Sequence, residues 1–252
     1  MFIRAVLIDL DETIYDERHC VKYALEKASA HAVSKHSTIQ RQLLETTYLT
    51  EANKRWDAFE AEIRIKGRSV QLDSLRVREM CFAQALAISN GPPSLAPELT
   101  RFYGEIRKNH HLLFSDAKRV LDKLRKQAFL ALVTNGGSTY QREKIRATGI
   151  EHFFHTIVIS EEAGYSKPQK GIFEKALREV GVPAHEAVMV GDSVENDVSG
   201  ARIAGMRGIL VVRNGSKHQK VDVTQISPQP DAIVSSLNDL IKTLTEFAGQ
   251  KA

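Results

Sequence analysis

The sequence predicts an α/β protein, built as a doubly wound, Rossmann-like parallel sheet with a helical domain inserted after the first strand. Three observations support this fold class. Short apolar stretches of strand length alternate with helical stretches along the second half of the chain, which is typical of parallel sheets covered by helices on both faces. Residues 16–110 show helical periodicity and no convincing strand. Hydrophobic residues make up 42% and charged residues 26% of the 252 residues, as in ordinary globular proteins.

The first element is a short apolar run over residues 2–10, rich in Ile, Val and Leu, which predicts a buried strand. After it, apolar residues recur at helical spacing, with breaks near Ser37, residues 67–69 and residues 90–93. These breaks divide the segment into about four helices. The apolar positions are Val21, Ala24, Leu25 and Ala28; Leu43, Leu44, Tyr48 and Leu49; Leu75, Met80, Ala83 and Leu86; and Leu99, Phe102 and Ile106.

Strands and helices alternate in the remaining chain. The first strand must join their sheet, because nothing else is available to cover it. We therefore expect an α/β core domain formed by residues 1–15 and 111–252, and a helical cap domain formed by residues 16–110. The predicted strands are 129–134, 156–160, 187–190 and 208–212, and the predicted helices are 117–127, 139–148, 168–180, 197–204 and 235–247.

Composition excludes several classes of protein. The net charge is +4, but acidic and basic residues are interleaved, so we expect solvated helix faces and no nucleic-acid partner. The chain has two cysteines, which excludes a disulfide framework. No apolar run approaches the ~20 residues of a membrane span. We expect a cytoplasmic protein with no membrane partner, and the sequence leaves its oligomeric state open.

Polar residues follow several of the predicted strands at the edge where parallel sheets bind ligands. Asp9, Asp11 and Thr13 follow the first strand, and residues 134–137 follow the next one. Asp192, Asn196 and Asp197 follow a later strand, and Lys167 lies between these groups in the sequence. Carboxylates gathered at one sheet edge require a cation, and oxygen ligands without His or Cys favour Mg²⁺.

At these residues the chain resembles the hydrolases of the haloacid dehalogenase superfamily, in the branch with a helical cap after the first motif. Asp9-x-Asp11-x-Thr13 resembles the first motif and Thr134-Asn135-Gly136 the second. Lys167-Pro168 with Gly171-Ile172-Phe173 resembles the third, and Gly191-Asp192-Ser193-x-x-Asn196-Asp197 the fourth. The chain departs from the family pattern at Glu12, where Gly or Asn is more usual, and at Lys170, where a second Pro often stands.

The resemblance implies a Mg²⁺-dependent phosphatase that acts through an aspartyl-phosphate on a small phosphorylated metabolite, such as a nucleoside monophosphate or a sugar phosphate. It makes Asp9 the nucleophile and Asp11 the acid and base for proton transfer. It assigns the other roles as follows: the metal to Asp9, the Asp11 carbonyl and Asp192; the phosphate to Thr134, Asn135, Gly136 and Lys167; and supporting positions to Asp197, Asn196 and Thr13.

Two alternatives to the phosphatase remain, a phosphomutase of the same superfamily and a non-catalytic regulatory or binding protein with this fold. Asp11 favours phosphoryl chemistry over halide displacement, which needs no acid on the leaving group. The cap is expected to close over the site and to select the substrate, together with the loop of residues 14–16. Four cap residues are candidates for ligand contact, although helix core or solvated faces are the favoured interpretation: Arg55, Trp56, Phe59 and Arg64.

The histidine pairs His110–His111 and His152/His155 suggest a transition metal only weakly. The first pair is adjacent in sequence, so its side chains point apart on a helix, and the second lacks a third ligand. We expect all four to be surface or core-edge residues.

Overall fold

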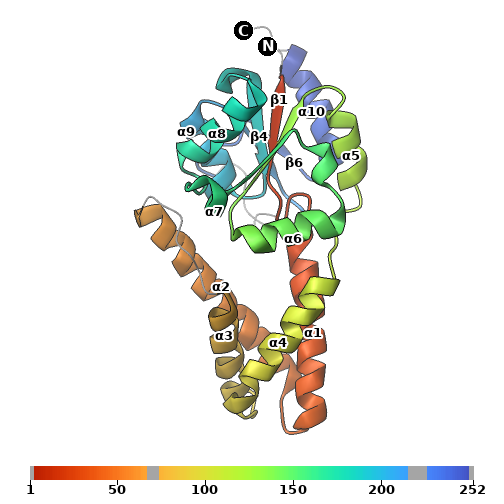
Figure 1. Ribbon diagram of the computed structural model, residues 1–252, viewed down its shortest axis with the longest axis vertical. Coiled ribbons are helices and arrows are strands. Elements are labelled where there is room, and N and C mark those ends of the chain that lie inside the picture. Colours follow the sequence, from red (N-terminus) through yellow and green to blue (C-terminus); the bar gives the residue numbers. More distant parts are fainter. Residues whose placement is uncertain (1–2, 67–73, 215–225, 250–252) are drawn as a thin grey trace. The chain divides into compact units, whose positions relative to one another are not determined.

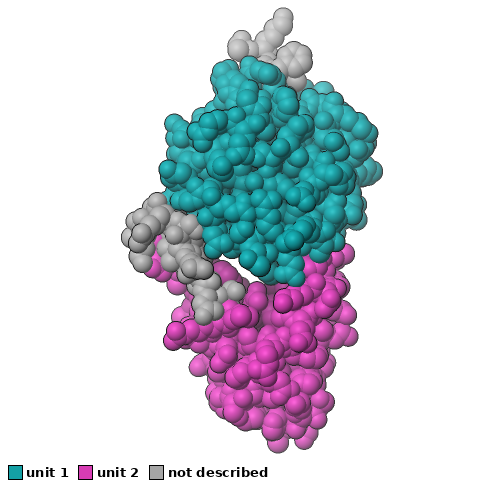
Figure 2. Space-filling view, viewed as in Figure 1, with its two compact units in different colours: residues 1–16, 67–69, 113–252 teal, residues 17–66, 70–112 magenta. Residues whose placement is uncertain are grey.

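A computed structural model describes residues 3–66, 74–214 and 226–249. The chain forms two compact units. One comprises Met1–Asp16 and Leu113–Ala252, and the other comprises Glu17–Lys66 and Val70–Leu112 (Figure 2). The first unit is the α/β unit and the second is the helical unit.

The α/β unit contains a six-stranded parallel sheet with the strand order β3-β2-β1-β4-β5-β6. This confirms the predicted fold class. The prediction was incomplete at one edge, because it lacked β6, a strand of three residues that pairs with β5 alone among the described strands. The strands are β1 (Ala5–Ile8), β2 (Phe129–Thr134), β3 (Thr156–Ile159), β4 (Ala187–Gly191), β5 (Arg207–Val211) and β6 (Ala232–Val234).

Helices cover both faces of this sheet (Figure 1). On one face, α8 packs on β1, β2 and β3 and α9 packs on β5, and Leu7 and Val133 join Phe173 of α8 in a single apolar cluster. Because side chains alternate along a strand, Val6 and Ile8 face the other side, and they too are fully buried. The helices are α5 (Ala117–Leu124), α6 (Ser138–Thr148), α7 (Ser160–Ala163), α8 (Lys170–Val180), α9 (Ser199–Ala204) and α10 (Leu237–Gly249), with short 3-10 turns at Glu151–Phe153 and Ala184–Glu186.

The register of the central strands determines where the polar residues emerge. Ile8, the last residue of β1, lies opposite Leu132 of β2 and Val190 of β4. The Asp9 amide continues the ladder by donating to the Val190 carbonyl at 2.9 Å. The chain therefore leaves β1, β2 and β4 at nearly the same level, which places the polar residues after these strands at one edge of the sheet.

The helical unit has its own apolar core. Leu25, Leu44, Phe82 and Leu99, one from each helix, belong to one buried cluster. At the ends of α1 and α4, the buried Arg107 donates to both carboxylate oxygens of Glu17 at 2.8 Å. The helices are α1 (Glu17–Lys35), α2 (Arg41–Lys66), α3 (Ser74–Ile88) and α4 (Ala96–Asn109), with a 3-10 turn at Pro93–Leu95.

Three predicted helix starts were two residues too early. The last helix, predicted from residue 235, begins at Leu237, and the other two lie at the sheet edge. The helix predicted from Pro168 begins at Lys170, because Lys167 and Pro168 lie in a turn that precedes it. The helix predicted from Asp197 begins at Ser199, and Asp197 instead lies in a π-helical turn, Val194–Val198. Both predicted starts lie next to the cluster of polar residues at the sheet edge, where the backbone follows side-chain contacts as well as helical periodicity.

Both cysteines, Cys20 and Cys81, are buried, and they form no disulfide. Among the residues that the structure describes, no helix has the length and apolar composition that crossing a membrane requires.

Candidate active site

The turn after β1 carries Asp9, Asp11 and Thr13. Asp9 is almost fully buried, and its Oδ2 accepts a hydrogen bond from Thr13 Oγ1 at 3.2 Å. Glu12 adopts a positive φ of 60°, which costs a non-glycine residue roughly 1–2 kcal/mol. This conformation gives a physical reason why Gly or Asn is more usual at that position. The amide of Glu12 donates to the Tyr15 carbonyl at 2.8 Å, which closes the turn.

A buried ion pair between Arg213 and Asp116 fixes the position of this turn. Arg213, which follows β5, donates to the Thr13 carbonyl at 2.7 Å and to Asp116 Oδ2 at 2.9 Å. The Leu237 amide of α10 donates to the same Asp116 oxygen at 2.8 Å. Because Arg213 and Asp116 are both buried, removal of either charge would leave the other unpaired at a large cost. The segments that carry Asp116, Arg213 and Leu237 are distant in sequence, and these contacts connect them to the turn that carries Asp9.

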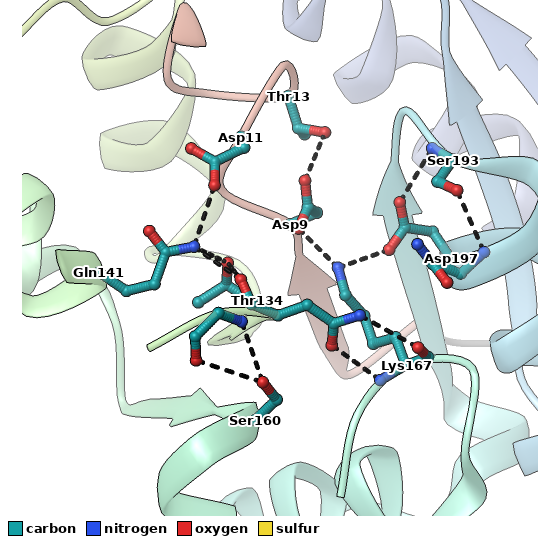
Figure 3. Close-up of polar contacts among 12 residues, drawn as sticks. Asp9, Asp11, Thr13, Thr134, Gln141, Ser160, Lys167, Ser193 and Asp197 are labelled. Carbon is teal, nitrogen blue, oxygen red and sulfur yellow. Dashed lines mark hydrogen bonds and ion pairs between the residues drawn. The ribbon is translucent and has the colours of Figure 1, made fainter. Parts of the chain in front are cut away.

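Lys167 lies between two acids (Figure 3). Its Nζ donates to Asp9 Oδ1 at 2.5 Å and to Asp197 Oδ1 at 2.7 Å. All three side chains are almost fully excluded from solvent. The second oxygen of Asp197 accepts from the Ser193 amide at 3.0 Å, and Ser193 Oγ accepts from the Asn196 amide at 3.1 Å. The π-helical turn thereby aims Asp197 at the lysine.

The electrostatics of this cluster follow from burial and charge. Burial raises the pKa of the Asp9 carboxyl to about 7; Lys167 opposes the rise, and the Asp197 carboxylate adds to it. Burial and the carboxylates of Asp9 and Asp197 raise the pKa of Asp192 well above its usual range. Burial would lower the pKa of the Lys167 ammonium, but Asp197 and Asp9 outweigh it and raise that pKa. The cluster therefore has a shortage of positive charge.

Three carboxylates of this cluster suit a divalent cation. Oxygen atoms of Asp9, Asp192 and Asp197 lie within 4.8 Å of one another. The three acids and Lys167 together carry a net charge of about −2 when all four groups are ionised. Both oxygens of Asp9 accept hydrogen bonds, from Lys167 and Thr13, and so do both oxygens of Asp197, so hydrogen bonding alone does not rank these acids as ligands. A hard cation with oxygen ligands, such as Mg²⁺, fits this donor set.

The residues after β2 serve the site in different ways. Thr134 is buried at the end of β2. The Asn135 side chain clamps the Lys167 backbone, because Oδ1 accepts from the Lys167 amide at 2.8 Å and Nδ2 donates to the Lys167 carbonyl at 3.0 Å. The Gly136 amide donates to Ser160 Oγ at 2.9 Å, so a phosphoryl oxygen at this amide would have to displace Ser160.

Asp11 faces α6, the helix that follows this loop. Its Oδ1 accepts from Lys144 Nζ at 2.7 Å, and its Oδ2 accepts from Gln141 Nε2 at 2.9 Å. The same Gln141 nitrogen lies 2.8 Å from Thr134 Oγ1 and 2.8 Å from the Asn135 carbonyl. Asp11 also interacts with the nearby Asp9 carboxyl, whose pKa it helps to raise. One helix therefore holds both oxygens of Asp11, and Figure 3 shows the contact with Gln141 beside the cluster around Asp9.

With the geometry known, comparison with other proteins identifies the family. The family model for haloacid dehalogenase-like hydrolases matches residues 3–205. This chain belongs to the haloacid dehalogenase-like (HAD) hydrolases. The match spans the turn after β1, the helical unit, and the loops that carry Lys167 and Asp197.

Curated relatives of this HAD hydrolase are phosphatases. It is 30% identical over 247 residues to the glyceraldehyde 3-phosphate phosphatase of Methanopyrus kandleri, an alignment that covers 98% of this chain and 99% of that protein. It is 40% identical over 137 residues to the phosphoserine phosphatase of Thermus thermophilus, covering 54% of this chain and 55% of that one. The first relative is thus matched over its whole length and the second over about half.

Solved structures show the same fold. The magnesium-bound HAD hydrolase YfnB of Bacillus subtilis aligns with a TM-score of 0.76 at 24% identity, covering 97% of this chain and 99% of that one.

Sequence reasoning missed two residues of the HAD site, Gln141 and Lys144. They lie one helical turn apart on the face of α6 that also buries Ile145 and Thr148. Polar residues in step with a buried helical face are the signal that could have revealed them. Their partner, Asp11, lies more than a hundred residues earlier in the chain, so local pattern alone does not link them.

Two of the four candidate residues of the helical segment, Arg55 and Trp56, have side chains that the structure describes. Arg55 pairs with Glu51 one turn away on α2 at 3.2 Å. The interpretation of Trp56 as a helix-core residue was wrong, because its side chain is 40% exposed. The side chains of Phe59 and Arg64 lie outside the described part of the structure.

The histidines belong to no group of potential metal ligands found among the described residues. His110 stacks on Tyr23 with 3.9 Å between ring centroids, and His155 Nδ1 accepts from the Leu130 amide at 3.0 Å. Among described residues, the single group of three or more potential metal ligands is Asp9, Asp192 and Asp197, which contains no histidine.

Proposed function

We propose that this HAD hydrolase is a Mg²⁺-dependent phosphatase that hydrolyses a small phosphorylated metabolite through an aspartyl-phosphate intermediate. The observation that carries the proposal is the arrangement around Asp9. This carboxylate is buried at the end of the central strand, 2.5 Å from a buried lysine, with a second aspartate two residues later. The phosphatase names of the curated relatives support the same chemistry.

In the first step, an oxygen of Asp9 attacks the phosphorus of the ester. A bond forms between that oxygen and phosphorus, and the bond from phosphorus to the leaving oxygen breaks. Lys167, whose ammonium touches Asp9 Oδ1, offsets the repulsion between a carboxylate and an anionic ester. Thr134 Oγ1 and the Asn135 amide are the proposed donors to the phosphoryl oxygens, and the Gly136 amide joins them only by exchanging Ser160 for phosphate.

Asp11 carries the protons. It gives a proton to the leaving oxygen in the first step, so the alcohol departs neutral. In the second step water attacks the phosphorus of the acyl phosphate, Asp11 takes a proton from that water, and the bond from phosphorus to the Asp9 oxygen breaks. Inorganic phosphate leaves, and both aspartates return to their starting states.

Mg²⁺ would be held by Asp9, Asp192 and the backbone carbonyl of Asp11. When bound, it supplies positive charge against the phosphoryl oxygens. Asp197 acts through Lys167, which it touches at 2.7 Å. Thr13 and Asn196 support the site from the turns that hold Asp9 and Asp197.

The names of the relatives narrow the substrate class. Phosphoserine and glyceraldehyde 3-phosphate are both small metabolites with a phosphate on a primary alcohol. We place the substrate of this chain in the same class, a small phosphomonoester of an alkyl alcohol.

Phosphate release from a panel of such esters, measured with Mg²⁺ and with excess EDTA, tests the proposal. The panel contains phosphoserine, glyceraldehyde 3-phosphate, sugar phosphates, nucleoside monophosphates and p-nitrophenyl phosphate. We expect turnover of at least one ester that stops with EDTA and returns when Mg²⁺ is restored. If no ester in the panel shows metal-dependent turnover, the result would contradict the proposal and favour a binding protein with this fold.

A further inference from the structure

Lys144 is a second buried lysine at the active-site edge, and the mechanism above gives it no task. We propose that Lys144, with Gln141 beside it, is a positioning residue that orients the Asp11 carboxyl group for proton transfer to the leaving oxygen. The inference rests on the proposed function, because it assigns a residue to a step of that reaction.

The contacts fix the plane of the Asp11 carboxyl group. Lys144 Nζ donates to Oδ1 at 2.7 Å and Gln141 Nε2 donates to Oδ2 at 2.9 Å. Residues three apart lie on the same side of a helix, so both donors come from one rigid surface. A carboxyl group held at each oxygen by a separate donor loses its freedom to rotate. Proton transfer depends steeply on this orientation.

The surroundings of Lys144 fix the donor itself. The lysine is 1% exposed, and its Nζ lies 5.0 Å from the centre of the Tyr15 ring and 4.3 Å from the centre of the Tyr140 ring. Aromatic faces attract an ammonium ion. Tyr15 belongs to the same turn as Asp11, so the lysine is braced against the segment that it orients.

Burial of this charge has a cost that packing alone does not explain. A methionine at position 144 would fill the same space on the buried face of α6 without desolvating an ammonium ion. Asp11, in contrast, keeps 31% of its side chain exposed, so water could satisfy its charge without a buried partner. The lysine therefore gives Asp11 an orientation that solvent would not impose.

The test compares esters whose leaving groups need a proton to different extents. An alkyl phosphate from the panel releases a strongly basic alkoxide and depends on the acid, whereas p-nitrophenyl phosphate releases a weakly basic phenolate and does not. The parameter is kcat/KM, which reports the steps up to release of the alcohol. The variants are Lys144→Met, Lys144→Arg and Asp11→Asn. Arg146→Met is the matched control, since it removes a positive charge from an exposed position of the same helix.

For Lys144→Met we expect kcat/KM to fall about 10–100-fold on the alkyl ester, a part of what general acid catalysis contributes, and less than about threefold on p-nitrophenyl phosphate. Asp11→Asn should show the same selectivity more strongly. Lys144→Arg should recover part of the loss, because it keeps a cationic donor. Arg146→Met should match the wild type on both esters.

Equal losses on the two esters, or no loss on either, would overturn the positioning role. Thermal unfolding shows whether Lys144→Met is folded, and Lys144→Gln gives the same comparison should the methionine variant fail to fold. The wild-type enzyme separates this inference from the proposed function. If it turns over neither ester with Mg²⁺, the proposed function fails, whereas normal wild-type turnover with an unselective Lys144→Met variant refutes the positioning role alone.

Discussion

A Cβ atom at Gly191 would lie 2.1 Å from Oδ2 of Asp197, so the last residue of β4 is a glycine because the carboxylate occupies that space. The same oxygen accepts from the Ser193 amide, and the other oxygen of Asp197 accepts from Lys167. Gly191→Ala would push Asp197 away from the lysine. We expect the free energy of unfolding to fall by about 1–3 kcal/mol, as in other overpacked sites, and turnover to fall with it.

Urea unfolding and phosphate release test this substitution, with Gly104→Ala as the control. Gly104 lies within α4, and an added Cβ would meet nothing within 4 Å. That change should stabilise the protein by roughly 0.5–1 kcal/mol, because alanine favours a helix over glycine. Similar effects of the two alanines would show that contact with Asp197 does not determine the residue at position 191.

Asp9→Asn should abolish turnover and leave the fold intact. The amide keeps the shape of the side chain but is not a nucleophile, and we expect kcat to fall by at least about a thousandfold, as when other covalent catalysts lose their nucleophile. Phosphate release measures the loss, and circular dichroism checks the fold. Turnover near the wild-type rate would rule out Asp9 as the attacking group.

The sequence pattern predicted that Asp9 and Asp192 lie at one sheet edge, because each directly follows a buried strand. Apolar runs end at Asp9 and before Asp192, and in a parallel sheet such ends lie at one edge. The pattern could not show that Asp11 turns toward α6, because the contact with Lys144 depends on how that helix packs. It also missed β6, whose three residues pair with one neighbour and carry too little periodicity to stand out.

A side-chain contact also explains one of the helix starts that sequence reasoning misplaced. Asn135 clamps both the amide and the carbonyl of Lys167, which holds residues 167 and 168 outside the helix that periodicity assigned to Pro168. A contact between segments more than thirty residues apart leaves no trace in local periodicity. Functional sites are where such conflicts between local pattern and final structure are expected.

Lys167→Met should destabilise the protein strongly when metal is absent. It leaves Asp9 and Asp197 buried beside each other without the cation that both contact. Breaking a buried ion pair on one side costs about 3–5 kcal/mol. Lys170→Met is the matched control, because its pair with Glu174 is exposed and exposed pairs contribute about 0–1 kcal/mol. Urea unfolding in EDTA compares the two variants. Equal losses in the free energy of unfolding would mean that the buried ion pair stabilises the protein no more than the exposed one.

Stability and metal binding should depend on pH through Asp9. Its pKa rises from 3.8 to about 7 in the folded, metal-free protein. An acid with a raised pKa favours folding fully below its unfolded pKa, and this contribution is lost as the pH rises toward the folded value. As the pH rises from about 4 to about 7, Asp9 should therefore progressively lower the free energy of unfolding of the metal-free protein. The proposed Mg²⁺ would bind the ionised carboxylate, so protons should compete with it at low pH.

We therefore expect Mg²⁺ to raise the melting temperature more at about pH 8 than at about pH 5.5, because a ligand stabilises the folded state in proportion to its affinity there. Thermal unfolding with Mg²⁺ or EDTA at the two pH values measures this difference. Asp9→Asn provides the reference, since it removes the titrating group and should weaken the dependence on pH. If Mg²⁺ raises the melting temperature of the wild type equally at both pH values, Asp9 does not bind the metal and other groups do.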